Sequence, residues 1–154
     1  MFTTTTYGTW LPGDMRGYVG DRLILPPNPA LLSHARGMLA SEPVYLTSLE
    51  QEMAFEALRA SAIEFGYRLT DASVESWHAH WIVEHGFDAV EAVAGRLKTR
   101  MRQVLARGRV WTEGYCHRCL HSVAEIETAR QYIARHGGCR MSGGRIRGGG
   151  CPPA

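Results

Sequence analysis

The positions of hydrophobic and polar residues along the chain predict an α+β protein. The first ten residues, MFTTTTYGTW, are rich in β-branched and aromatic side chains, as is typical of a strand. Residues 47–66 open with two pairs that fit a capping box, Ser48 with Gln51 and Thr47 with Glu50, and continue with apolar residues at helical spacing. Residues 67–76 and 79–84 then predict two strands that meet in a tight turn.

The second half of the chain continues this alternation. Residues 88–108 predict an amphipathic helix, and residues 109–120 predict a strand or an extended segment. A third helix is expected from the capping residue Ser122 to the paired glycines Gly137 and Gly138. The order β-α-β-β-α-β-α predicts a ferredoxin-like, split βαβ antiparallel sheet with an extra C-terminal helix.

Two segments lack a regular pattern. The spacing of proline and glycine in residues 11–29 predicts a long loop, and long loops in compact domains are often functional. Residues 138–154 have no apolar periodicity and are rich in glycine and arginine, which predicts a flexible basic tail. A chain of 154 residues is too short for two ordinary domains, so we expect one domain over residues 1–137 followed by this tail.

Composition narrows the cellular setting. Hydrophobic residues make up 45% and charged residues 21%, which is typical of a globular protein. No apolar run approaches the ~18 residues of a membrane helix, and the N-terminus lacks the features of a secretion signal. We therefore expect a cytoplasmic protein that does not enter a membrane, with cysteines that serve as thiols or metal ligands rather than disulfides.

The net charge of +2 conceals an uneven distribution. Residues 1–91 carry five basic and twelve acidic groups, a net charge of −7, whereas residues 92–154 carry twelve basic and three acidic groups, a net charge of +9. Such asymmetry favours a polyanionic partner for the second half, most simply a nucleic acid. The alternative is a basic surface that only balances an acidic one.

Two histidines mark a candidate metal site. His78 and His80 are two residues apart near the start of a predicted strand, so both imidazoles lie on one face of the sheet. Two ligands rarely hold a metal, and the pair alone is equally compatible with ordinary sheet histidines. His85 has an odd spacing from His80 and is expected on the opposite face.

The last predicted helix offers further ligands. Tyr132 and His136 are four residues apart, one helical turn on the same face. If this face turns toward His78 and His80, three imidazoles and one phenol meet. The alternative is an interface tyrosine and a histidine that interacts with the helix dipole.

A histidine–small residue–histidine strand, a basic helix and a helix with tyrosine and a polar residue one turn later resemble the single-tyrosine HUH endonucleases. Within them the chain is most similar to insertion-sequence transposases and REP-associated tyrosine transposases. TYGTWLPGD, residues 6–14, also resembles the first strand and loop of one group of these proteins. The similarity covers residues 2–137.

The resemblance implies a ferredoxin-like catalytic domain that nicks single-stranded DNA beside a hairpin, through a 5′-phosphotyrosine intermediate and with release of a 3′-hydroxyl. It assigns His78 and His80 as metal ligands and Tyr132, carried on the extra helix, as the nucleophile. His136 falls at the third ligand position, where the family has Gln or Asn. Mg²⁺ or Mn²⁺ is the implied cofactor. A homodimer is compatible with it, because some relatives assemble composite sites from two chains.

The chain also departs from the family pattern. Trp77 stands where Asp or Asn is usual, Ala79 replaces a larger aliphatic residue, and His136-Gly137 replaces the usual Asn-Pro of the REP-associated branch. An all-imidazole site favours Mn²⁺ or softer metals. These departures allow an altered activity.

Several residues are candidates for contact with nucleic acid. Cations on the second predicted helix and just after it fit phosphate contacts, and nearby aromatic rings fit stacking on unpaired bases, although Trp111 fits the core at least as well. The early loop adds candidates for contact with the hairpin. The full set is Arg96, Lys98, Arg100, Arg102, Arg107, Arg109, Trp111 and Tyr115, with Tyr7, Trp10 and Arg16 from the early loop.

A structural zinc site is the alternative function. Cys116 and Cys119 form a C-x-x-C with His121 nearby, and Cys139 or Cys151 would complete the ligand set. The protein would then be a nucleic-acid-binding module without catalysis.

Overall fold

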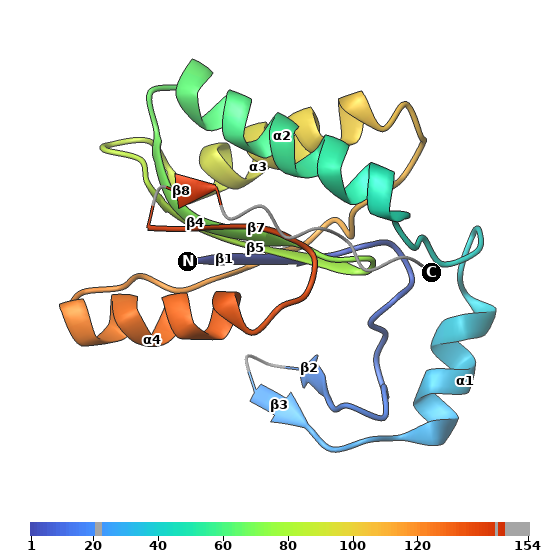
Figure 1. Ribbon diagram of the computed structural model, residues 1–154. Helices are drawn as coiled ribbons and strands as arrows, with labels where there is room; N and C mark the ends of the chain where they lie inside the picture. The colour runs from blue at the N-terminus through green and yellow to red at the C-terminus, as the bar shows by residue number, and fades with distance from the viewer. Residues whose placement is uncertain (21–22, 144, 147–154) are drawn as a thin grey trace.

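The computed structural model describes residues 1–20, 23–143 and 145–146, which form a six-stranded sheet with helices on both faces (Figure 1). Every pair of neighbouring strands in this sheet is antiparallel. The predicted α+β class is confirmed. The strands, in their order across the sheet, are β6 (Cys116–His117), β1 (Phe2–Thr5), β5 (His78–Glu84), β4 (Arg68–Val74), β7 (Cys139–Ser142) and β8 (Arg145–Ile146).

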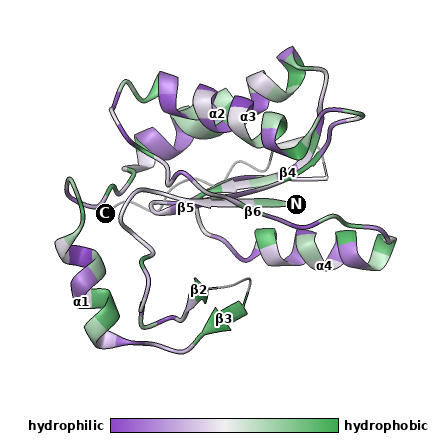
Figure 2. Cartoon of the chain, turned by 180° about the vertical axis from the view of Figure 1, so that it is seen from behind, coloured by the Kyte–Doolittle hydropathy of each residue, from purple (hydrophilic) through white to green (hydrophobic). Residues whose placement is uncertain are grey.

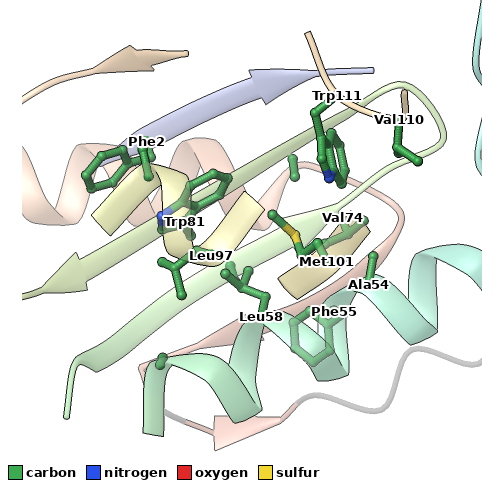
Figure 3. Close-up of a cluster of buried hydrophobic side chains, with 14 of the residues drawn as sticks. Phe2, Ala54, Phe55, Leu58, Val74, Trp81, Leu97, Met101, Val110 and Trp111 are labelled. Atoms are coloured by element: carbon green, nitrogen blue, oxygen red, sulfur yellow. The ribbon is translucent and has the colours of Figure 1, made fainter. Parts of the chain in front are cut away.

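The two faces of the sheet are covered by different helices. α2 (Ser48–Glu64) and α3 (Val90–Val104) lie together on one face, and α4 (Val123–Ala134) lies on the other (Figure 1). The main core is on the side of α2 and α3, where Trp81 of β5 stacks on Phe2 of β1 with the ring centroids 5.5 Å apart (Figure 3). Burial of such aromatic and aliphatic surface is the dominant stabilising term.

β5 divides its side chains between the two faces. Ala79, Trp81 and Val83 belong to the main core beneath α2 and α3. Ile82 instead packs with Ala129 and Ile133 of α4. His78 and His80 have the same parity as Ile82 and therefore face α4, as the period of two predicts.

α4 is fixed to the sheet by an ion pair between its half-buried Arg130 and a buried carboxylate, as well as by this small apolar cluster. Asp71 lies beside a register shift in β4 and its side chain is only 1% exposed. The Nε of Arg130 in α4 donates to Asp71 at 3.0 Å, and the backbone N–H of Gly143 donates to its other oxygen at 3.0 Å. One carboxylate thus joins the helix, β4 and the turn after β7.

The early segment is more regular than the predicted loop. It contains a two-stranded hairpin, β2 (Tyr18–Gly20) and β3 (Leu23–Leu25), and the helix α1 (Pro29–Gly37). Figure 2 shows β3 coloured as hydrophobic, and its Leu23 and Ile24 are exposed. The side chain of Asn28 caps α1 by accepting from the backbone N–H of Leu31. Asn28 followed by Pro29 was a signal for this helix, since proline is favoured in the first turn.

The predicted boundary between domain and tail is wrong. Residues 139–142 form β7, paired with β4, and residues 145–146 form β8, so the sheet extends past residue 137. Met141 is 4% exposed and joins the main core. A four-residue strand with one buried apolar side chain gives no readable alternation, which explains the error. Residue 144 and residues 147–154 of the predicted tail lie outside the described residues.

In the part of the chain that the structure describes, no helix has both the length and the apolar character needed to cross a bilayer.

Arg130→Met should destabilise the protein by about 3 kcal/mol, because it leaves the buried Asp71 carboxylate without its cation. Equilibrium unfolding in urea measures this change. Arg59→Met is the matched control, since Arg59 pairs with Glu56 in an exposed i,i+3 bridge on α2 and should change stability by less than about 0.5 kcal/mol. Equal stabilities of the two variants would show that the buried pair does not hold α4.

Candidate metal centre

Three histidines meet between the sheet and the end of α4. His78 and His80 come from β5, and His136 follows the last turn of α4. The ring centroids are 4.7 Å apart for His78 and His80, 4.9 Å for His78 and His136, and 4.7 Å for His80 and His136. One ligand atom from each lies within 4.8 Å of the others. The structure therefore brings together the predicted set, and the three residues could hold a metal ion.

The hydrogen bonds of the rings leave nitrogen lone pairs for a metal. Nδ1 of His80 is 2.8 Å from Oγ1 of Thr3, while its buried Nε2 has no partner among the described residues. Nδ1–H of His136 donates to the carbonyl of Tyr132 at 3.0 Å, which leaves Nε2 as the unprotonated nitrogen. The buried Nδ1 of His78 likewise has no partner within the described part of the chain. Unpartnered ring nitrogens on the buried His78 and His80 fit a metal site, and hydrogen bonds orient the rings of His80 and His136 from behind.

The electrostatics favour neutral imidazoles. Desolvation by burial, with contributions from His136 and Arg16, lowers the pKa of His78 to about 4. Burial, with contributions from His78 and His136, lowers the pKa of His80 to about 3. Both rings are thus unprotonated at neutral pH and need lose no proton to bind a cation.

The position of His136 is set by the residues that follow it. The backbone N–H of Gly138 donates to Glu75 at 2.6 Å, and a Cβ at residue 138 would lie 2.2 Å from the carbonyl oxygen of Val74. Only glycine permits this close approach. Arg140 also donates to the carbonyl of His136 at 3.0 Å. Sequence reasoning missed these supports, although the paired glycines after the histidine were a signal for them.

Tyr132 lies at the open side of the cluster. Its ring centroid is 5.0 Å from that of His80 and 5.0 Å from that of His136. The residue is 46% exposed, and none of the described residues forms a hydrogen bond with its hydroxyl. The side chain is therefore both next to the histidines and accessible to a substrate.

The early loop also reaches the site. The guanidinium carbon of Arg16 lies 4.4 Å from the Trp77 ring centroid, and the Trp77 ring is 3.9 Å from that of His78. Trp10 contacts Trp77 edge to face at 6.3 Å. Arg16 and Trp10, two of the predicted nucleic-acid contacts, thus lie beside the histidines. Tyr7 is buried instead, and its hydroxyl accepts from the backbone N–H of Ala40.

The basic residues of α3 lie on the other side of the sheet and are largely engaged. The ammonium group of the half-buried Lys98 already donates to the carbonyls of Thr112 and Gly114, at 2.6 and 2.8 Å, and its contact with phosphate stays a prediction. Most of the predicted arginines pair with carboxylates, whereas Arg102 is exposed and in none of the ion pairs found among the described residues. The pairs are Arg96–Asp88, Arg100–Glu64, Arg107–Glu50 and Arg109–Glu113.

The aromatic residues after α3 are packed into the protein. Trp111 is 6% exposed and belongs to the main core (Figure 3), which corrects the prediction that its ring stacks on bases. Tyr115 is partly buried and lies 6.0 Å from the Phe2 ring. The β-bridge between Trp111 and Thr6 explains the burial, because it draws this segment across the end of β1.

The alternative zinc site is incomplete in the described residues. Cys116 and Cys139 stand on β6 and β7, with three strands between them. At about 4.8 Å per strand spacing, they are roughly 19 Å apart, too far to share a metal. Cys151 lies outside the described residues. Within residues 1–20, 23–143 and 145–146, the three histidines are the only group of three or more such ligands.

Comparison of the chain with models of known protein families and with curated proteins finds no match.

Thr3→Val should weaken divalent metal binding about tenfold, because Oγ1 of Thr3 orients the His80 ring from behind. Titration with Co²⁺, followed by its visible spectrum, measures the affinity. Thr5→Val is the matched control, since Thr5 is two residues along the same strand but bonds to Thr112. Equal affinities of the two variants would contradict a role for Thr3 in orienting a ligand.

The metal-free protein should lose stability as pH falls below about 6.5. The pKa of His80 is about 3 in the folded chain and 6.5 in the unfolded chain, so between these values the unfolded chain binds the extra proton. One pKa unit corresponds to about 1.4 kcal/mol, so at least about 2 kcal/mol should be lost by pH 4.5. Urea unfolding of wild type and His80→Gln across this range isolates the contribution. Parallel profiles for the two proteins would show that His80 is not held neutral.

Proposed function

We propose that the protein is a metal-dependent, single-tyrosine nuclease and strand transferase that acts on single-stranded DNA beside a hairpin. The observation that carries this proposal is the group of three histidines, with ligand atoms within 4.8 Å of one another, next to an accessible tyrosine. The resemblance of HAH and YIARH to the HUH endonucleases supports the same assignment.

The strand order supports a ferredoxin-like fold for this activity. The order β6-β1-β5-β4, with α2 between β1 and β4 and α3 between β5 and β6, is the order that a split βαβ sheet would have. In this interpretation β7, β8 and α4 are additions to it. α4 is the extra helix that carries the tyrosine.

His78, His80 and His136 would hold the metal, and the donor set fits Mn²⁺ or a softer ion better than Mg²⁺. When bound, a divalent cation would polarise the phosphodiester by withdrawing charge from its oxygens. The remaining steps use groups of the chain itself. His78 and His80 enter as neutral ligands because burial lowers the pKa of each.

The Tyr132 hydroxyl is the proposed nucleophile. Its oxygen forms a bond to the phosphorus while the bond from phosphorus to the 3′-oxygen of the preceding nucleotide breaks. The tyrosine gives up one proton and the departing 3′-oxygen takes one up, so the step is balanced. Attack by another 3′-hydroxyl reverses it and rejoins strands.

Incubation with a pool of hairpin-bearing single-stranded oligonucleotides, with Mn²⁺ or Mg²⁺, should yield a covalent protein–DNA adduct. Tyr132→Phe should abolish it, because no other group replaces the nucleophile. Denaturing gels and mass spectrometry of the linked peptide detect the adduct.

Tyr67→Phe is the control, since Tyr67 donates to Asp88 on the α3 side of the protein and should leave adduct yield unchanged. Absence of any Tyr132-dependent adduct across the pool, with both metals, would refute the proposal.

A further inference from the structure

A cavity of about 580 Å³ lies between the early loop, α1 and the segment that follows α1. Its volume is within the range of about 300–1,000 Å³ typical of small-molecule sites. Polar and charged side chains dominate its lining together with a few apolar ones. They include Asp14, Arg16, Leu32, Arg36, Glu42 and Tyr45.

Arg16 connects this cavity to the histidines. It lines the cavity, and its guanidinium also lies over the Trp77 ring at 4.4 Å. The Trp77 ring also contacts His78, with the two ring centroids 3.9 Å apart. Arg16 and Trp77 thus lie between the cavity and His78.

The Arg16 side chain is held in place by its own neighbours. Nε and Nη2 donate to the two carboxylate oxygens of Asp14, both at 2.8 Å, and Nη2 also donates to the carbonyl of Thr9 at 2.6 Å. Nη1 has no partner among the described residues. A fixed guanidinium with a free amino group beside an aromatic ring is suited to a phosphate next to a stacked base.

The charges inside the cavity favour a base over a phosphate. Asp14 is already engaged by Arg16, while Arg36 and Glu42 take part in none of the ion pairs found in the described part of the chain. One guanidinium and one carboxylate offer both donors and acceptors, and the carboxylate repels phosphate. A carboxylate accepts readily from the amino group of cytosine, whereas thymine presents a carbonyl there.

We infer that this cavity and the Arg16–Trp77 pair bind one unpaired nucleotide of the DNA strand, an inference that rests on the proposed function. The cavity holds the base, with a preference for one that carries an exocyclic amino group. Arg16 holds the adjoining phosphate, and the strand continues over Trp77 to the histidines. The early loop and α1 thereby select the strand that is presented to Tyr132.

The test measures binding without chemistry, so that its outcome is independent of cleavage. Labelled oligo(dC) and oligo(dT) are titrated with Tyr132→Phe protein in the absence of divalent metal, and fluorescence anisotropy gives the affinities. We expect oligo(dC) to bind at least about threefold more tightly than oligo(dT), and Glu42→Gln to remove that difference. Equal binding of the two, unaffected by Glu42→Gln, would overturn the placement of the base.

Arg16→Met, made in the Tyr132→Phe protein, should weaken the binding of both oligonucleotides about tenfold. It should also lower the salt dependence of binding by about one phosphate contact. Arg36→Met, at a residue with no ion pair among the described residues, should weaken binding severalfold without affecting the loop. Arg59→Met on α2 is the matched control and should bind as the parent does. The inference would be overturned if Arg16→Met left the affinity and its salt dependence unchanged. It would also be overturned if Arg36→Met and Glu42→Gln both bound the two oligonucleotides as the parent does.

Two further outcomes separate this inference from the proposed function. Binding that depends on Arg16 and Glu42, without any Tyr132 adduct in the wild type, would sustain the nucleotide site and reject the nuclease. An adduct formed equally well by wild type and Arg16→Met would support the nuclease and reject the nucleotide site. Competition by deoxycytidine monophosphate at the same concentration as oligo(dC) would assign the cavity to free nucleotides and overturn the strand path.

Discussion

The geometry of the candidate site depends on the ion pair between the Asp71 carboxylate and Arg130 of α4. Among the described residues, the buried apolar cluster between α4 and the sheet consists of Ile82, Ala129 and Ile133, with the partly buried Met1 and Leu120 packed against it, which is little area to fix a helix. The ion pair between Asp71 and Arg130, with the N–H of Gly143 on the other carboxylate oxygen, adds the directional contact that positions the helix. Because a buried carboxylate without a partner is costly, the arrangement admits one position of the helix.

This constraint explains why the two faces of the sheet differ in chemistry. The face under α2 and α3 is a conventional core of aromatic and aliphatic residues. The face under α4 carries threonine, aspartate, serine and histidine, whose polar atoms need partners. Glu75 binds the backbone of Gly138 and Thr3 binds His80. Polar contacts on this face therefore do two things: Asp71 attaches α4, and Glu75 and Thr3 position the residues next to and within the histidine group.

The sequence was informative where the chemistry followed a short local period. The alternation in β5 placed His78 and His80 on one face, and the helical turn placed Tyr132 next to His136; both relations depend only on backbone geometry. The fold class followed from the same periods. What was missed depends on distant contacts: β7 is recognisable only from its pairing with β4, and Trp77 joins Arg16 to His78 only after the early loop folds back.

The charge asymmetry between the two halves of the chain was also misleading, because the pairing of charges depends on distant contacts. Much of the +9 charge of the second half neutralises acidic residues of the first half, as in Arg100–Glu64, Arg107–Glu50 and Arg130–Asp71. Composition predicted a basic surface on α3, yet the pairs of Arg100 and Arg107 exist only because α3 and the residues after it pack against α2. The pair of Arg130 exists only because α4 packs on β4. Charge counted along a chain overestimates the charge that is free to meet a ligand.

The electrostatic character of the site is better judged from its immediate neighbours. Three neutral imidazoles would leave the full positive charge on a bound divalent cation, whereas carboxylate ligands would partly cancel it. Trp77 carries no charge, and the guanidinium of Arg16, held over its ring, is one of the groups that lower the pKa of His78. With a divalent cation bound, the site would be electropositive without the α3 arginines, while Asp14 offsets the charge of Arg16. An anionic substrate would be drawn to the end of the sheet where Arg16, His78 and Tyr132 converge, and not to the face that the basic helix covers.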